Sequence, residues 1–290
     1  MRVTVTARDP PEHLFRHLLS AYLAGARSFE VVERRGVSPA TRQVVREFCR
    51  RTRHPQIVRD DGSVIALADR EPEETESVDV RLLQLGERVL DFHREAVESW
   101  DHLPLGDDGL WGRRDDDVDR EAWYLERCLA LGESRGNGGS QGVTSAWTIA
   151  RSLERIADHA VTLGEVGPRL ADLGADRGLL RELRQFHGQA MAHLTEVLGS
   201  PDGSRANDLL DVGEALLAGG RALSERLLPA VGDGSMPPAS AAAVARALEA
   251  IGRTVAYSQD IAQTFFDRAL RSPSLPLPPD AALAVPTLAG

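Results

Sequence analysis

The sequence predicts a mainly α-helical protein, in which two tandem three-helix bundles (six helices) follow a small α/β subdomain. Three observations predict this fold class. Strand-like segments occur only within the first 75 residues, where they are interleaved with two helical patterns. From residue 76 to residue 271, apolar residues recur at steps of three and four in six stretches. Two of those stretches, 150–165 and 245–263, share an apolar framework, which indicates an internal duplication.

The first 75 residues predict the order βαβαββ. MRVTVTA alternates as a strand does, and SFEVVE predicts a second strand. PPEHLFRHLLSAYLAGA and SPATRQVVREFCRRT predict helices, because each has proline near its first turn and apolar residues at helical spacing. In PQIVRDDGSVIAL, the Asp61-Gly62 pair predicts a hairpin turn. We expect a small α/β unit with helices packed on three or four strands.

The rest of the chain predicts helices in two sets of three. The boundaries that we expect are 1–75 for the α/β subdomain, 76–175 for the first bundle, 176–271 for the second, and 272–290 for a Pro-rich, disordered tail. The Gly-rich segment RGNGGSQG is expected to be a linker between helices, since it lacks the Lys-Ser/Thr of a phosphate-binding loop. The predicted helices are 77–100, 113–134, 143–174, 177–198, 204–228 and 239–271.

Composition and motifs disfavour several classes of protein. The formal net charge of −10 disfavours a general polyanion-binding surface. Two cysteines, Cys49 and Cys128, give neither a disulfide framework nor zinc-ligand spacing. No apolar run approaches the roughly 20 residues that a membrane span needs, and the N-terminus lacks a signal-peptide pattern. We therefore expect a soluble, cytoplasmic protein with no membrane insertion.

The segment SLERIADHAVTLGE (152–165) places two acids at the edge of its apolar stripe. Glu154 and Asp158 are four residues apart, so their side chains lie one above the other on a helix. Like charges at this spacing repel each other. A nearby cation would remove the repulsion.

These residues carry a resemblance to a known family. RSLERIADHAVTLGE resembles the ERxxDHAxxxAE signature of the PhoU family of phosphate-uptake regulators, and RRDDDVDREAWYLERCL resembles the family's preceding helix. LLSAYLAGARSFEVVERRGVSPATRQVVREF is similar to the α/β segment that archaeal members carry ahead of the bundles. Such members often begin with an AbrB-like DNA-binding domain. Only MRVTVTARDP precedes the α/β unit here, so we expect that domain to be absent.

The resemblance implies a metal site. PhoU bundles carry paired acidic motifs on neighbouring helices, and the matching residues here are Asp115 and Asp119 on one helix and Glu154 and Asp158 on the next. Packed helices lie about 8–10 Å apart, so two facing pairs bring four carboxylates together, as in carboxylate-bridged metal sites. All-oxygen ligands favour iron, manganese, magnesium or calcium.

An alternative without metal stands beside this prediction. The acids can form a solvated helix face that Arg120, Arg151 and Arg155 neutralise. His159 is expected to hydrogen-bond or cap a neighbouring helix rather than bind metal.

The second bundle departs from the acidic pattern. Glu249 aligns with the first acid of the signature, but Arg253 replaces the second. Asp208 and Asp211 remain on the middle helix, and the Arg253 guanidinium can take the place of the missing cation.

The resemblance implies a non-enzymatic regulator of phosphate uptake or phosphate signalling. Its implied partners are the ATPase of a phosphate transporter or an associated sensor or regulator protein, and a second copy of the chain in a homodimer. The first rival is a DNA-binding regulator, based on the basic stretch RQVVREFCRRTRH (42–54), which could also touch an acidic partner or only solvent. The second rival is a carboxylate-bridged metal enzyme.

Overall fold

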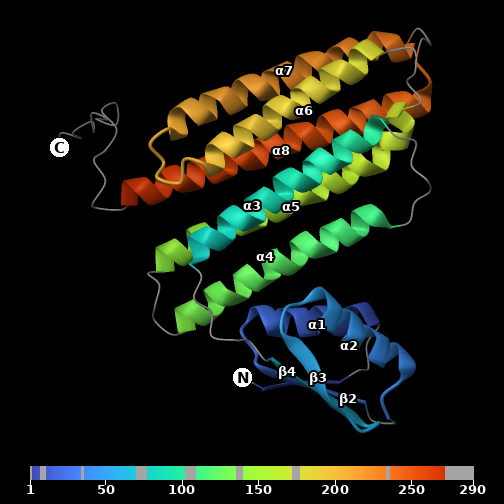
Figure 1. Cartoon of the computed structure of the whole chain (residues 1–290), viewed down its shortest axis with the longest axis vertical. Coiled ribbons are helices and arrows are strands. Elements are labelled where there is room, and N and C mark those ends of the chain that lie inside the picture. Colours follow the sequence, from blue (N-terminus) through green and yellow to red (C-terminus); the bar gives the residue numbers. More distant parts are fainter. Residues whose placement is uncertain are drawn as a thin grey trace, which may run out of the picture.

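The computed structural model describes residues 2–6, 11–33, 36–69, 77–101, 109–134, 140–171, 177–232 and 236–271. In these ranges the chain forms a small α/β unit followed by six long helices, which confirms the predicted fold class (Figure 1). All described strands lie before residue 70. The predicted tail at 272–290 lies outside the described residues.

The α/β unit has a four-stranded mixed sheet in the order β1-β2-β4-β3. The first two strands run parallel and are joined through α1, whereas β4 pairs antiparallel with both β2 and β3. The elements of this unit are β1 (Arg2–Thr6), α1 (Pro11–Leu23), β2 (Ser28–Val32), α2 (Pro39–Arg51), β3 (Pro55–Asp60) and β4 (Val64–Asp69).

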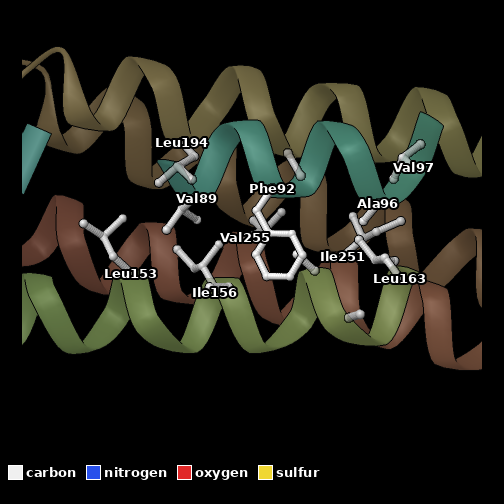
Figure 2. Close-up of a cluster of buried hydrophobic side chains, with 14 of the residues drawn as sticks. Val89, Phe92, Ala96, Val97, Leu153, Ile156, Leu163, Leu194, Ile251 and Val255 are labelled. Carbon is white, nitrogen blue, oxygen red and sulfur yellow. The ribbon is translucent and has the colours of Figure 1, made fainter. Parts of the chain in front are cut away.

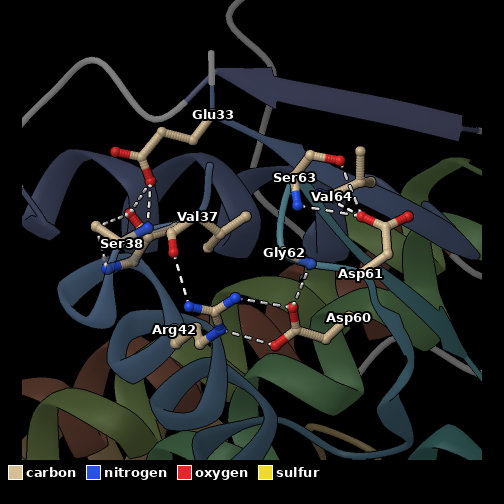
Figure 3. A network of polar contacts seen from close by, with 10 residues as sticks. Glu33, Val37, Ser38, Arg42, Asp60, Asp61, Gly62, Ser63 and Val64 are labelled. Carbon is tan, nitrogen blue, oxygen red and sulfur yellow. Dashed lines mark hydrogen bonds and ion pairs between the residues drawn. The ribbon is translucent and has the colours of Figure 1, made fainter. Parts of the chain in front are cut away.

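The turn between β3 and β4 confirms the predicted hairpin (Figure 3). Gly62 has φ +88°, a left-handed conformation that favours glycine. The Asp61 carboxylate accepts hydrogen bonds from the backbone N–H groups of Ser63 and Val64. These bonds lower the pKa of Asp61, since they stabilise its charged form.

The start of α2 is fixed by polar contacts to the same turn (Figure 3). Ser38 caps the helix by accepting a hydrogen bond from the Thr41 N–H, and proline follows at the first helical position. Arg42 binds the carboxylate of Asp60 through Nε and Nη2 and donates from Nη1 to the carbonyl of Val37. The helix is therefore anchored to the hairpin at its N-terminal end.

Helices α1 and α2 cover one face of the sheet (Figure 1). Phe48 of α2 is fully buried at the centre of this layer, with the rings of Phe15, Tyr22 and Phe29 at centroid distances of 5.6 to 6.3 Å. Edge-to-face rings at such distances stabilise the packing beyond simple burial.

The six remaining helices form one elongated body (Figure 1). The apolar periodicity placed most of their ends within a few residues of those observed. One difference is the start of α5: the Gly-rich segment was expected to extend to residue 142, but the helix already begins at Ser140. The helices are α3 (Val78–Glu98), α4 (Leu110–Ser134), α5 (Ser140–Ala171), α6 (Arg177–Leu198), α7 (Ala206–Gly232) and α8 (Pro238–Arg271).

A single hydrophobic core runs through both sets of helices. Figure 2 shows its centre, where side chains from α3, α5, α6 and α8 meet. Phe92 of α3 lies there with Ile156 of α5, Leu194 of α6 and Val255 of α8. None of the described helices is long and apolar enough to cross a membrane.

Helix α4 lies between this core and the α/β unit (Figure 1). Val118 and Leu125 face the core of the bundles, whereas Tyr124 is buried in the core of the α/β unit. Arg127 is fully buried, forms an ion pair with Asp69 at the end of β4, and donates to the carbonyl of Tyr22. The α/β unit is therefore attached to α4 by a buried charged contact as well as by apolar packing.

Candidate functional site

The four predicted acids come from two helices that pack together. Asp115 and Asp119 lie on α4, and Glu154 and Asp158 lie on α5. Asp119 is 8% exposed, Asp115 and Glu154 are partly buried, and Asp158 is exposed. The structure thus places the four acids along the contact between α4 and α5. We call these four residues the acidic cluster.

Burial and mutual repulsion raise the pKa values on α4. Desolvation, followed by the charges of Asp158 and Asp116, raises the pKa of Asp115 to about 6. Desolvation, Asp115 and the two α5 acids together raise the pKa of Asp119 to about 7, against the lowering effect of Arg51. The negative charges on α5 thus contribute to the raised pKa values of the α4 acids.

The pKa values of the two acids on α5 are also raised, but the positive charge beside them is a different one. Partial desolvation beside α4 is the main reason that the pKa values of Glu154 and Asp158 are raised, and Arg155 lowers both. Of the three arginines that the sequence suggested as neutralising partners, Arg155 acts on both α5 acids, and Arg151 acts on Glu154.

The other two arginines form their ion pairs outside the acidic cluster. Arg120 pairs with Asp117, one turn earlier on its own helix. Arg151 pairs with Glu126 of α4. Arg155 and Arg151 still lower the pKa values of the α5 acids, whereas the counter-charge of the α4 acids comes from another helix.

As they lie, these acids do not form a metal centre. In the described part of the chain, no three or more His, Cys, Asp and Glu side chains are grouped so that they could hold one ion. The carboxylate oxygens suit a hard cation chemically, but their placement does not gather them around a common point. Metal binding by Asp115, Asp119, Glu154 and Asp158 therefore stays a prediction from the sequence.

The main positive charge at the α4 side of the cluster is Arg51, from the last turn of α2. Its Nη2 donates to Oδ2 of Asp119 over 2.8 Å. Its Nε lies 2.8 Å from Oδ1 of Asp116, but the N–H is not aimed at that oxygen, so this contact is an ion pair without a hydrogen bond. The sequence did not identify Arg51 as a partner of the acids.

Two further arginines next to Arg51 bind the same face of α4. Arg50 Nη2 lies 2.6 Å from Asp116 Oδ2, and Arg53 Nη2 lies 2.8 Å from Glu121 Oε1. The arginines in the C-terminal half of the basic stretch 42–54 therefore pair with acids of the same chain. Complementary runs of charge at 42–54 and 115–121 were the signal that could have revealed this contact. The Arg50 side chain is still 50% exposed beside these contacts, so DNA binding stays an alternative prediction.

The histidine of the signature, His159, packs against a neighbouring helix. Its ring stacks on Tyr257 of α8, with centroids 5.9 Å apart and planes at 22°. Burial, and then the positive charge of Arg253, lower its pKa. His159 therefore belongs to the packing between α5 and α8.

The second bundle shows no equivalent of the acidic cluster among the residues described. Arg253 Nη2 donates to the hydroxyl of Tyr257 on its own helix over 2.8 Å and lies over that ring. Asp208 and Asp211 are exposed on α7. Arg253 thus binds an aromatic residue, and the expected substitution of a guanidinium for a cation between these acids is not seen.

Comparison with known families gives one result. Residues 82–166 match the model of the PhoU domain. The range covers most of α3, all of α4 and most of α5, and it contains all four acids of the cluster. Over residues 82–166 this match confirms the resemblance that the sequence motifs suggested. The resemblance of the α/β segment, the archaeal type and the absence of an AbrB-like domain stay predictions. Comparisons with curated proteins and with solved structures gave no match.

Proposed function

Because the chain contains a PhoU domain at residues 82–166, we propose that it regulates phosphate uptake or phosphate signalling by docking on other proteins, without catalysing a reaction. The domain match is the observation that carries this proposal, since the PhoU family is a regulatory family of phosphate transport. Its partners would be the ATPase of a phosphate transporter, or a sensor or regulator associated with it, and a second copy of the chain in a homodimer.

The helical surface supports a docking role. A groove of about 470 Å³ runs between α6 and α7. Its floor is apolar, with Phe186 and Leu223, and charged residues such as Glu182 and Arg226 stand at its side. Apolar centres with polar rims are typical of protein–protein interfaces.

A deletion strain tests this proposal. We expect loss of the gene to change phosphate accumulation or transporter expression, while growth on other nutrients is unaffected. Uptake of radiolabelled phosphate at high and low external phosphate is the measurement, and re-expression of the intact chain is the control. Unchanged uptake and unchanged phosphate signalling under both conditions would refute the proposal.

A pull-down identifies the partner. The tagged chain is captured from phosphate-replete cells, and the proteins bound to it are identified by mass spectrometry. We expect a component of a phosphate transporter or of its sensor. The same capture from cells expressing an unrelated tagged helical protein removes non-specific binders.

A further inference from the structure

The groove between α6 and α7 has an apolar and nearly uncharged surface. Phe186 of α6 and Leu216 of α7 line it, and Val212, which also lines it, is 48% exposed. Its two charged side chains, Glu182 and Arg226, pair with each other. An uncharged, apolar segment therefore complements this groove better than a charged one.

The residues that follow α8 form such a segment by their sequence. In 272–290, Asp280 is the only charged side chain. Pro273, Pro276 and Pro279 recur every three residues, which is the period of a polyproline II helix. Segments of this kind bind in apolar grooves, because their preformed backbone loses little conformational entropy. We call residues 272–290 the tail.

Two glutamines of α6 match the backbone of such a segment. A polyproline II helix makes no internal hydrogen bonds, so its carbonyl groups need donors from elsewhere. Gln185 and Gln189 line the groove, and both are exposed and carry amide donors. The groove thus offers apolar contact and hydrogen-bond donors together.

The end of α8 lies beside the connection between α6 and α7 (Figure 1). A Cβ at Gly203 in this connection would lie 3.0 Å from the Cβ of Ala269, in the last turn of α8. Farther along, a Cβ at Gly213 would lie 2.6 Å from the Cγ of Gln259, so this end of the groove lies level with Gln259. Helix α8 continues to Arg271, about 18 Å beyond that level at 1.5 Å per residue.

The tail is long enough to turn back and cover the groove. It has to run about 18 Å to reach the level of Gly213 and about 20 Å more to reach Arg226. At about 3.1 Å per residue, residues 272–290 span about 59 Å. Leu283 reaches about 37 Å from the end of α8, which covers most of the groove, whereas Ser274 reaches only about 9 Å.

We propose that the tail binds in the groove between α6 and α7 of the same chain, where it competes with a docking partner. This inference rests on the proposed function, because it concerns access to the groove that supports docking. A tethered segment competes at an effective concentration of about 1 mM, so a partner has to bind tightly enough to displace it. Access to the groove is thereby regulated by the chain itself.

Photo-crosslinking of the purified full chain tests the proposal. The photoreactive amino acid benzoylphenylalanine replaces Leu283, and an equal mixture of isotope-labelled and unlabelled chains is irradiated, digested and analysed by mass spectrometry. We expect crosslinks to residues 182–189 of α6 or 212–226 of α7, formed within one chain. The proposal is wrong if no crosslink reaches these residues. It is also wrong if the crosslinks join labelled to unlabelled chains, since a second copy would then occupy the groove.

Variants of two exposed glycines sharpen this test. A Cβ at Gly219, which lines the groove, or at Gly188, which lies on α6 outside it, would meet no atom within 4 Å. Gly219→Phe places a ring in the groove and should lower the crosslinking yield from Leu283 at least about tenfold, whereas Gly188→Phe should leave it unchanged. Equal losses in the two variants, or an equal yield of groove crosslinks from benzoylphenylalanine at Ser274, would overturn the proposal.

Substitutions in the tail give a second readout. Ala281→Asp with Val285→Asp adds charges on both sides of Leu283 and should lower the crosslinking yield at least about tenfold, because charges in an apolar groove lose their hydration. Ser272→Asp with Ser274→Asp adds equal charge next to α8 and is the control. An unchanged yield in the first variant would contradict the proposal.

The tail substitutions lie outside the described helices, so their test holds even if Gly219→Phe does not fold. All of these measurements use purified protein. Their failure would leave the phosphate phenotype of the deletion strain as a separate test of the proposed function.

Discussion

The two bundles differ most in what covers their middle helix. In the first bundle, α4 has the shared core on one side and the α/β unit on the other. In the second bundle, α7 buries residues such as Leu209 and Leu223, while Val212 remains 48% exposed. Among the described residues, the same three-helix arrangement therefore has one face that the α/β unit covers and one face that no other element covers.

The two bundles also differ in the charged residues that they carry. On the closed face, the pKa values of Asp115 and Asp119 are raised, and Arg51 of α2 pairs with Asp119 and with the neighbouring Asp116. The bundle with the open face has lost an acid of the signature to Arg253, which binds Tyr257 instead. The repelling acids are thus found in the first bundle, where α2 supplies a counter-charge.

The largest effect is expected from breaking the contact that closes the first bundle. Asp69→Asn leaves the charge of Arg127 buried without its partner, because both side chains are only 1% exposed. We expect a loss of about 3 kcal/mol in the free energy of unfolding, measured by urea denaturation. Asp79→Asn, which removes the exposed pair with Arg268, is the control and should change stability by less than about 1 kcal/mol. Similar losses in both variants would mean that the buried pair does not stabilise the interface.

The second prediction concerns a contact between the bundles. His93 of α3 and His187 of α6 lie with Nδ1 and Nε2 3.3 Å apart, and His93 Nε2 lies 2.8 Å from the carbonyl of Ile156. Burial lowers the pKa of His93 to about 3 and that of His187 to about 4, from an ordinary value of 6.5.

The unfolded chain therefore takes up protons below pH 6.5 that the folded chain does not. The free energy of unfolding therefore keeps its full value above pH 6.5. It falls by about 1.4 kcal/mol per pH unit for each histidine as the pH drops toward 4. Urea denaturation between pH 7 and pH 5 should show a flatter dependence for the double variant His93→Asn/His187→Asn, with exposed His13→Asn as the control. An equal slope in the wild type and the double variant would contradict this account.

A third prediction compares the helix contacts within each bundle. In the first, a Cβ at Gly164 of α5 would lie 2.3 Å from the ring of Trp111; in the second, a Cβ at Gly213 of α7 would lie 2.6 Å from Gln259. The indole ring is rigid and stacked on Phe92, whereas the glutamine side chain can move aside. Gly164→Ala should therefore cost about 2 kcal/mol, and Gly213→Ala clearly less.

Thermal melting of these variants is the measurement. Gly188→Ala is the control, because its Cβ would meet no atom within 4 Å, and alanine in a helix is favoured over glycine by about 0.5–1 kcal/mol. Equal destabilisation by the substitutions at 164 and 213 would show that both helix contacts accommodate an added methyl group equally well.

The smallest effect is expected from removing charge in the acidic cluster. Glu154→Gln with Asp158→Asn keeps the shape of the side chains and removes two repelling charges, so stability at pH 7 should rise by about 1 kcal/mol. Because the raised pKa values of Asp115 and Asp119 make the repulsion weaken as pH falls through 7 and 6, the gain should shrink in acid.

Glu249→Gln in the second bundle is the matched control and should not stabilise the protein. Melting curves with and without a chelator, together with elemental analysis, would also show whether metal contributes. A double variant no more stable than the wild type at pH 7 would indicate that the acids are a solvated face.

Apolar periodicity and turn chemistry were sufficient to predict the helices, the hairpin at Asp61-Gly62 and the division into an α/β unit and six helices, because these features depend on local spacing. The order of the strands was not predicted, because pairing joins β2 to β4 across α2 and β3. Arg51 was missed for a similar reason: it meets Asp119 across 68 residues of sequence. Paired acids on one helix are visible in a sequence, but the arginine that balances them belongs to tertiary structure.

The single core that runs through α3, α5, α6 and α8 makes the two sets of three helices depend on each other for burial. A fragment ending after α5 would leave the α5 side chains that pack on α8 facing water, and α6 to α8 alone would be exposed in the same way. Each set of three helices therefore covers apolar side chains of the other. We expect the helical region to unfold in one cooperative transition. A destabilising substitution in either bundle should therefore unfold both bundles together.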